Sequence, residues 1–501
     1  SGPWLALTNH RHELWLVNLD TSQAQRLEAN VHGRLGGLCW SPCGHFLAYS
    51  SPTGRLTSKL RCADVREAEP PLHDLTEGCY RDVAPSFDPQ GRHLYFLSLR
   101  TFNPVWDNLF FELSFPNGMK PYALVLRDDL PHPFEFDPVP KPETPKAEKS
   151  KKKEEKPTVE PTRIDFEGLQ QRIVAFPLGE GRYGQVIGCG DTILYTRYPV
   201  EGTLEEDHST VPSARGTLYS YDLKTQENKE LYTRVSGFTT SVDGKWLCYQ
   251  SGTKLRIATV EKKPESQEES NPRKSGWIAP ARLRVAVESQ PEWLQMAREA
   301  WRLMREHYFN PQLPHPDWEA IFRRYEPLLA RVGCRSELSD WLWELQGELG
   351  TSHAYESGGD YNAEPVHPLG KLGLSWHWDK KARGYRIDSI SQGDSWDPQA
   401  RSAALLGQRL QVGDVVTHIQ ARPLSPNRAP EAELVYVSRE DIEFTVVRQG
   451  EVRRLTVRPL RAQAPLMYRE WVEGNRRRVH EASQGRLGYL HVPNMGPLGF
   501  S

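Results

Sequence analysis

A turn followed by an apolar strand recurs through the first half of the chain and is the feature that most limits its fold. "WSPCGHFLAYSS" starts at Trp40, "SFDPQGRHLYFLS" at Ser86 and "SVDGKWLCYQS" at Ser241, and "GCGDTILYTRY" from Gly188 is a looser copy. Each copy has a polar turn with a glycine at its tight position and then a run of apolar residues, which is typical of a hairpin entering a buried strand. Gly44 and Gly91 lie 47 residues apart, close to the ~40–50 residues of one four-stranded propeller blade. We therefore expect propeller blades; a β-sandwich with chance similarity between its turns is the alternative.

Further strands and one interruption complete this first domain, which we place at residues 1–284. "ELWLVNLD", "GTLYSYDL" and "KLRIATV" have the pattern of strands between the repeated turns. The units are too few for a complete ring, so we expect a partial β-propeller. Residues 137–161, "DPVPKPETPKAEKSKKKEEKPTVEP", contain no aromatic residue and are rich in Lys, Glu and Pro. Such a segment cannot bury enough apolar surface to offset the entropy of ordering, so it is expected to be a disordered insertion.

Composition excludes several classes of partner. The chain has 501 residues, too many for a single hydrophobic core, so roughly three or four domains are expected. Its formal net charge of -2 provides no excess positive charge that would attract nucleic acid or an anionic membrane. No apolar run approaches the length of a membrane span. The seven cysteines are sparse and form no C-x-x-C pair. That pattern suits reduced thiols in a cytoplasmic protein with no metal site and no cofactor.

Residues 285–365 have the periodicity of a small helical module. "SQPEWLQMAREAWRLMREHYF" opens with Ser289 and Glu292 in capping-box register, and a stripe of aromatic and small residues follows at helical spacing. A second helix is expected from Asp317 to about Ala330. A third is expected from a Ser336 cap until Gly350, with Leu338, Trp341, Leu342, Leu345 and Leu349 on one face. His353 in "ELGTSHAYE" then lies on the connection that leaves a well-anchored helix.

Residues 366–461 are expected to form a small β domain, and residues 462–501 to begin a further, α/β domain. "QVGDVVTHIQ" resembles the corresponding stretch of PDZ domains, and Leu372, Gly373 and Leu374 resemble the loop by which PDZ domains bind a terminal carboxylate through backbone N–H groups. After them, "YREWVEGNRRRVHEAS" predicts a helix on which Arg476, Arg477 and Arg478 form a solvated face. "GRLGYLHVPNMGPLGFS" is expected to begin a new strand.

His353 is a candidate general base. A general base needs a nucleophile within hydrogen-bond reach and usually a group that holds its tautomer. No G-x-S-x-G, H-E-x-x-H or Walker pattern occurs, and the two S-x-x-K matches, Ser150–Lys153 and Ser251–Lys254, lie in the charged insertion and in a propeller turn. Alone, a histidine in such a turn could merely cap helix carbonyls. His367, His377 and His418 have no comparable context and are read as structural or surface residues.

The order of these segments resembles the tricorn protease family over nearly the whole chain. The resemblance rests on the propeller segment "YRDVAPSFDPQGRHLYFLSLRTFNPVWDNLFFELSFPNGMKPYALVLRDDLPHPF", the helical module with "GTSHAYE", the PDZ-like domain and then "YREWVEGNRRRVHEASQGRLGYLHVPNMG". It implies a large cytoplasmic serine peptidase, assembled as a hexamer, that trims oligopeptides released by the proteasome or similar proteases. The family's first propeller has no counterpart in the chain.

The resemblance also implies site residues. His353 corresponds to the catalytic base, Ser352 to a supporting hydroxyl, and Gly496 to a position whose backbone N–H helps form the oxyanion hole. The family's nucleophilic serine and its glutamate fall in the last domain, beyond these 501 residues, so Ser501 is not expected to be the nucleophile and this segment is expected to be inactive alone. Two alternatives stay open: a non-enzymatic propeller and PDZ scaffold that binds peptide C-termini, and a relative of the carboxy-terminal processing peptidases.

Overall fold

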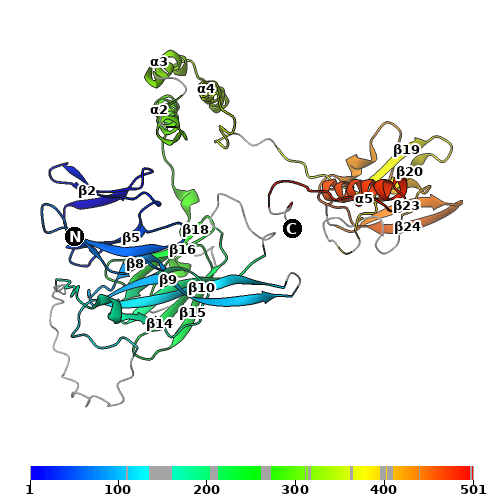
Figure 1. The fold of residues 1–501 in the computed structure, drawn as a ribbon. Coiled ribbons are helices and arrows are strands. Elements are labelled where there is room, and N and C mark those ends of the chain that lie inside the picture. Colours follow the sequence, from blue (N-terminus) through cyan, green and yellow to red (C-terminus); the bar gives the residue numbers. More distant parts are fainter. Residues whose placement is uncertain are drawn as a thin grey trace. The chain divides into compact units, whose positions relative to one another are not determined.

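The chain forms a mainly β, multidomain structure that divides into two compact units. The computed structural model describes residues 2–108, 111–134, 161–202, 213–260, 272–310, 312–313, 317–361, 365–394, 396, 402, 410–438, 440–496 and 499. The two units are Ser1–Trp318 and Glu319–Ser501. The first consists mostly of strands, and the second holds helices and a smaller sheet (Figure 1). The expected insertion at 137–161 lies, apart from Pro161, outside the described residues.

The described strands of the first unit form five successive antiparallel groups of three or four strands. One parallel bridge, Ser58 to Arg81, joins the second group to the third. The groups are β1 Trp4–Thr8, β2 Glu13–Asn18 and β3 Ala24–Ala29; β4 Gly36–Trp40, β5 Phe46–Pro52, β6 Ser58–Asp64 and β7 Leu72–Asp74; β8 Arg81–Phe87, β9 His93–Asp107, β10 Glu112–Val125 and β11 Ile173–Ala175; β12 Arg182–Cys189, β13 Thr192–Tyr198, β14 Gly216–Asp222 and β15 Asn228–Val235; and β16 Gly237–Thr240, β17 Trp246–Ser251 and β18 Lys254–Thr259. This arrangement confirms the propeller blades predicted from the repeated turns.

Each repeated turn joins the first two strands of a blade around a glycine in the left-handed region. Gly44, Gly91, Gly190 and Gly244 have φ values of 76°, 68°, 73° and 66°. Three of the turns share one hydrogen-bond pattern, in which a backbone N–H reaches the carbonyl five residues on: Ser41 to Phe46 at 2.8 Å, Asp88 to His93 at 2.9 Å and Ser241 to Trp246 at 2.9 Å. Because glycine alone adopts this φ without a steric cost, the turn residue sets the register of the hairpin.

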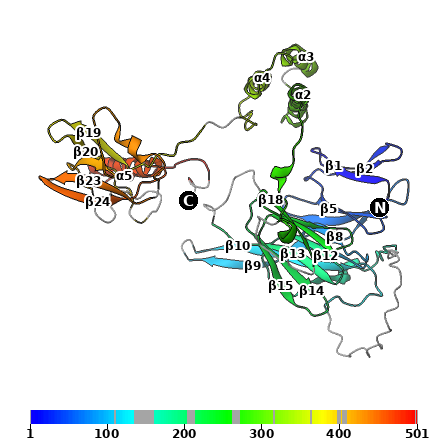
Figure 2. The same ribbon diagram turned by 180° about the vertical axis from the view of Figure 1, so that it is seen from behind.

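The blades pack face to face. Leu14 and Leu16 of β2 share a core with Leu47 and Tyr49 of β5. In the same way, Leu194 of β13 packs with Leu247 of β17. The views from the front and from behind show the β9–β10 hairpin running beyond its neighbouring strands (Figures 1 and 2). Removal of these apolar faces from water is the main term that holds the blades together.

A buried ion pair lies within the third blade, next to hydrogen bonds that reach it from the second. Asp82 of β8 is fully buried, and both of its carboxylate oxygens lie 3.2 Å from Nη2 of Arg100. Its backbone carbonyl also accepts hydrogen bonds of 2.7 Å from the hydroxyls of Ser50 and Ser58 on the preceding blade. The Arg100 guanidinium pairs with the buried carboxylate, and removal of either side chain leaves the other charge without its partner.

After the last blade come the short helix α1 Pro272–Ser275, the 3₁₀ turn Pro280–Arg282 and the long helix α2 Ser289–His307. The predicted capping box at Ser289 was wrong. Glu288 takes the N-cap position without a side-chain cap bond, and its carbonyl accepts the first helical hydrogen bond from the Glu292 N–H at 3.2 Å. The helix therefore starts one residue too early for the Ser289 hydroxyl to cap it. Trp301 of α2 and Trp318 exchange two hydrogen bonds from indole N–H to backbone carbonyl, of 3.0 and 3.2 Å.

Two helices occupy the start of the second unit: α3 Trp318–Leu329, which begins at the boundary, and α4 Arg335–Gly347. The predicted stripe on α4 is confirmed, because Leu338, Trp341, Leu342, Leu345 and Leu349 are all buried. Ser336 is not the cap. Cys334 holds that position, and the Glu337 carboxylate reaches back to the Gly333 N–H at 2.7 Å, so Ser336 lies inside the first turn.

The PDZ-like sheet has the order β19-β20-β21-β23-β24, with β22 paired to β21. Its strands are β19 Leu374–Asp379, β20 Gly384–Ile390, β21 Val415–Ile419, β22 Arg422–Pro423, β23 Ile442–Arg448 and β24 Glu451–Val457, and a 3₁₀ helix spans Pro430–Leu434. Ile387, Val416 and Phe444 are central to its core. Helix α5 Ala464–Ala482 lies across one face of the sheet (Figures 1 and 2).

Beyond the sheet, one prediction holds and one fails. Arg476, Arg477 and Arg478 are exposed on α5, as predicted. The strand expected after the helix is not formed, because the described residues 487–494 have no regular structure and no described strand pairs with them. A strand needs a partner for its backbone groups, so an apolar pattern alone does not make one.

We predict that Asp82→Ala destabilises the first unit by about 3–5 kcal/mol, because the Arg100 charge is left buried without its partner. Urea-induced unfolding measures the change. Asp74→Ala is the matched control on the neighbouring blade: Asp74 pairs with Lys59 and Arg61, but its side chain is half exposed, so a loss within ~1 kcal/mol is expected. Equal effects of the two substitutions would contradict the role assigned to burial.

The β19–β20 hairpin is predicted to weaken in acid. Hydrogen bonds from the backbone N–H of Ala382 and from Arg386 lower the pKa of Asp379 to about 2, from an ordinary value of 3.8. Because the pKa is lower in the folded chain, the carboxylate stabilises the hairpin above about pH 4, and that contribution is lost as the pH falls toward about 2. Hydrogen exchange of β19 and β20, corrected for the intrinsic rate, should rise over this interval in the wild type. Asp379→Asn should flatten the rise; an unchanged profile in that variant would show that another group is responsible.

Candidate active site and peptide-binding cavity

His353 lies on an exposed loop that leaves the anchored helix α4. The helix ends at Gly347, and the chain continues in a tight turn in which the Gly350 N–H donates to the Gly347 carbonyl at 3.0 Å. Leu349 is buried, while residues 351–353 are all exposed. Leu345 and Leu349 thus hold the start of the loop in the core and leave its next residues at the surface. The ring is open to solvent and not sealed in an apolar interior.

The conformation of His353 is unusual for a residue with a side chain. Its φ is 64°, in the left-handed region that non-glycine residues rarely adopt. Its Nδ1 lies 3.4 Å from the hydroxyl of Tyr355, at the long end of hydrogen bonding. Among the described residues, no contact joins the Ser352 hydroxyl to the ring; the Ser352 carbonyl instead accepts from Thr351 at 3.3 Å. The supporting role of Ser352 therefore stays a prediction, and Tyr355 is the hydroxyl beside the ring.

Two glutamates bracket this loop, and each is bound by an adjacent helix. Glu348 accepts hydrogen bonds from Tyr325 at 2.7 Å and from Arg324 at 3.0 Å, both on α3. Burial and the hydrogen bond to Glu348 raise the pKa of Tyr325 to about 12. Glu356 accepts hydrogen bonds from Arg335 at 2.7 Å and from Ser339 at 3.0 Å, both on α4.

Sequence reasoning missed these partners. "ELGTSHAYE" shows an acid at each end, which was the available signal, but Arg335 and Glu356 are 21 residues apart and no local spacing rule pairs them. Three further histidines that were read as structural or surface residues each have a side-chain partner: the hydroxyl of Tyr436 for His367, the carboxylate of Asp388 for His377 and the hydroxyl of Thr417 for His418.

Gly496 lies in an irregular segment after α5. Its N–H donates to the side-chain oxygen of Asn494 at 2.8 Å, and its carbonyl accepts from the Gly499 N–H at 3.0 Å. Within the described part of the chain, no contact brings Gly496 to His353. The oxyanion-hole role of Gly496 therefore remains a prediction.

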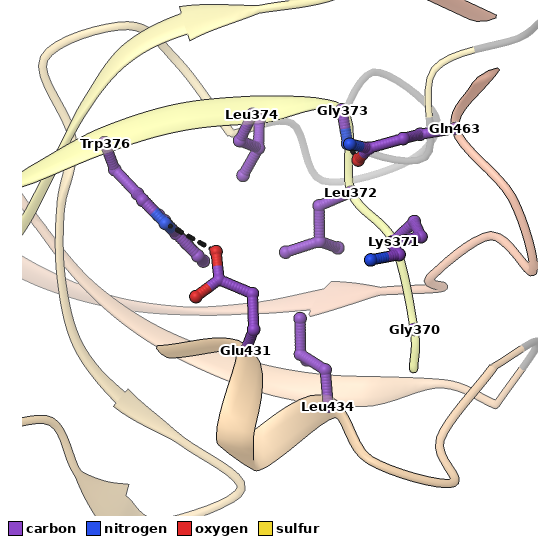
Figure 3. Close-up of a pocket in the computed structure, with 9 residues that line it drawn as sticks. All are labelled: Gly370, Lys371, Leu372, Gly373, Leu374, Trp376, Glu431, Leu434 and Gln463. Carbon is purple, nitrogen blue, oxygen red and sulfur yellow. Dashed lines mark hydrogen bonds between the residues drawn. The ribbon is translucent and has the colours of Figure 1, made fainter. Parts of the chain in front are cut away.

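The loop at Leu372, Gly373 and Leu374 lines a cavity of about 130 Å³ at the end of β19 (Figure 3). Leu372, Leu374, Trp376 and Leu434 supply its apolar wall. Glu431 lies opposite the loop and accepts a hydrogen bond from the Trp376 indole at 3.1 Å. A cavity with apolar walls and few polar groups is suited to an amino-acid side chain.

Several N–H groups of this loop already have acceptors. Gly370 donates to the Leu434 carbonyl at 2.8 Å and Lys371 to the Leu460 carbonyl at 2.9 Å. The Gly373 N–H donates to the side-chain oxygen of Gln463 at 3.3 Å, just before α5 (Figure 3). Gly373 has a φ of 65°, and a Cβ there would lie 2.6 Å from Leu466 of α5. Glycine is thus required for the close approach of the helix, whatever the loop binds.

In the described part of the chain, no three His, Cys, Asp or Glu side chains are grouped so as to hold a metal ion. None of the described helices combines the length and the apolar character that a membrane crossing requires.

Protein-family models match the chain in three places. The tricorn protease second beta propeller domain covers residues 1–261, the tricorn protease C1 domain residues 289–347 and the tricorn protease PDZ domain residues 370–462. His353 follows the matched C1 segment, and the cavity lies within the matched PDZ segment except for Gln463.

Individual relatives agree with these matches. Tricorn protease homolog 1 of Streptomyces coelicolor is 34% identical over 508 residues, covering 100% of this chain and 47% of the homologue. The putative tricorn-like protease C-terminal subunit of Sulfurisphaera tokodaii is 32% identical, with 100% and 55% covered. A crystal structure of the tricorn protease matches with a TM-score of 0.84 at 25% identity, covering 99% of this chain and 46% of that one. The chain spans about half the length of these relatives, and it belongs to the tricorn protease family.

Proposed function

We propose that the chain is part of a tricorn-type serine peptidase in which His353 is the general base. The observation that carries the proposal is an exposed imidazole on a loop held at both ends, directly after the helical module of a tricorn-family chain. The substrates are oligopeptides released by the proteasome or similar proteases. The protein acts in the cytoplasm as a homo-oligomer, a hexamer by analogy with the family.

The proposed chemistry needs a nucleophilic hydroxyl, and we place it outside these 501 residues. A serine from the part of the polypeptide beyond these 501 residues gives its proton to the His353 imidazole as it attacks the peptide carbonyl, and the imidazolium then protonates the leaving amine. In the structure Nδ1 faces Tyr355, so Nε2 is the nitrogen that receives the proton. Ser352 supports the imidazole, and the Gly496 N–H, released from Asn494, donates to the developing oxyanion.

The PDZ-like domain supports a second candidate function, the binding of peptide C-termini. The observation that favours it is the cavity beside Leu372, Gly373 and Leu374. Gln463 occupies the Gly373 N–H with a carbonyl-type oxygen, so a ligand carboxylate would take over that hydrogen bond while a terminal apolar side chain enters between Leu372 and Leu434. Such binding would be useful both to a peptidase and to a non-enzymatic scaffold. Loss of cleavage in His353 variants would identify the peptidase.

We predict that the 501-residue chain alone does not cleave peptides, and that the longer polypeptide that includes the nucleophile does. In that polypeptide His353→Ala should lower kcat by about 10²- to 10⁴-fold, because the proton has no acceptor in the transition state. Hydrolysis of a fluorogenic peptide measures both. His377→Ala is the control, since His377 is exposed and paired with Asp388, and it should leave kcat unchanged. Cleavage that survives His353→Ala would exclude the proposed base.

A second prediction concerns the PDZ-like loop. Gln463→Ala removes the internal acceptor that a ligand has to displace from the Gly373 N–H, and should therefore tighten the binding of a peptide with a free, apolar C-terminus by about three- to tenfold, roughly the net contribution of one neutral hydrogen bond. Calorimetric titration measures the change. The same peptide with an amidated C-terminus should gain little, and equal gains for the two peptides would show that the loop does not bind a carboxylate.

A further inference from the structure

We propose that Glu356 is a positioning residue for His353 and acts through Arg335 and Ser339 of α4. This inference rests on the proposed role of His353. It states that a cluster of residues fixes the position of the His353 side chain although the cluster touches neither the ring nor a substrate. The cluster consists of Arg335, Ser339, Glu356 and Tyr361.

The cluster ties the far end of the loop to the first turns of α4. Arg335 Nη2 donates to Glu356 Oε1 at 2.7 Å, and Arg335 Nη1 donates to the Ser339 hydroxyl at 2.6 Å. The Ser339 hydroxyl in turn lies 3.0 Å from the same Glu356 oxygen and hydrogen-bonds to the Tyr361 hydroxyl. The guanidinium carbon of Arg335 lies 5.4 Å from the centroid of the Tyr361 ring. One carboxylate oxygen therefore connects the loop to two side chains of the helix.

Burial distinguishes this anchor from an ordinary surface ion pair. The side chains of Arg335 and Glu356 are only 11% and 16% exposed, whereas Arg324, which binds the other end of the loop through Glu348, is 63% exposed. Pairs held away from water are screened little, and loss of one partner leaves the other uncompensated. Glu356 is therefore the stronger of the two charged anchors.

The position of His353 depends on such an anchor because little else holds it. The ring is exposed, its one hydrogen-bond contact within the described residues is the 3.4 Å approach of Tyr355, and its backbone has a left-handed φ. A backbone in that region persists only where its surroundings impose it. The fixed points nearest in sequence are Leu349, four residues before, and Glu356, three residues after. A general base that drifts by about 1 Å loses much of its rate advantage, so fixing the loop fixes the base.

The experiment compares Glu356→Ala, Glu356→Gln and Asp360→Asn. Asp360 is the matched control, because it also faces Arg335 but at 3.7 Å and with its side chain 88% exposed. In the 501-residue chain, the backbone order of residues 351–355, measured by NMR relaxation, should fall in Glu356→Ala, while that of the interior of α4 stays near the wild-type value. Glu356→Gln keeps an oxygen acceptor for Arg335 and Ser339 and should lie between the two. Asp360→Asn should match the wild type.

The second measurement is catalytic activity, because a purely structural role of Glu356 would not lower kcat selectively. In the polypeptide that includes the nucleophile, Glu356→Ala should lower kcat by about 10- to 100-fold with little change in KM, since substrate contacts are kept and only the base is displaced. Unchanged loop order, equal losses of order in the loop and in α4, or a wild-type kcat in Glu356→Ala would each overturn the inference. Failure of the proposed function has a different signature: His353→Ala would then leave the rate of cleavage unchanged, whatever Glu356→Ala does to the loop.

Discussion

The left-handed backbone at the blade turns is the constraint on which the first unit depends. A glycine at that position lets a polar turn reverse the chain while the residues around it keep the same hydrogen bonds, as at Ser41 and at Ser241. Once the register of a hairpin is fixed, alternate side chains go to opposite faces, and both faces can be buried between neighbouring blades. A shift of one residue would exchange the two faces of a strand such as β5, where Leu47 and Ala48 enter different apolar clusters.

Features that depend on short stretches of sequence could be predicted. The blade turns, the apolar stripe of α4 and the strands of the PDZ-like sheet follow from periods of two or 3.6 residues and from turn chemistry, which act locally. The start of a helix was harder to place, because adjacent residues compete for the cap and one residue decides the outcome: Glu288 took the place expected of Ser289, and Cys334 that of Ser336. The strand expected after α5 required a partner strand, which no local pattern can supply.

The candidate site depends more on distant contacts. His353 could be singled out because it follows a helix end in "ELGTSHAYE", but the groups around it could not. Arg335 and Glu356 meet only because α4 and the loop fold back on each other, and Gly373 meets Gln463 across 90 residues of sequence. In both places a backbone of positive φ sits beside a long-range polar contact. Local propensity opposes such a conformation at His353, so tertiary contacts have to supply its stability.

The two loops use opposite means to hold a backbone near the surface. Around Gly373 the chain is held by close packing: the residue has no Cβ, and Leu466 of α5 fills the space that a Cβ would take. Around His353 packing is sparse, and charge and hydrogen bonds hold the chain from α3 and α4. A reacting side chain has to face solvent or substrate, so it cannot be fixed by burial of its own surface. For the general base proposed at His353, buried and charged anchors a few residues away are the proposed solution to that conflict, because such anchors order the backbone and leave the imidazole free to exchange protons.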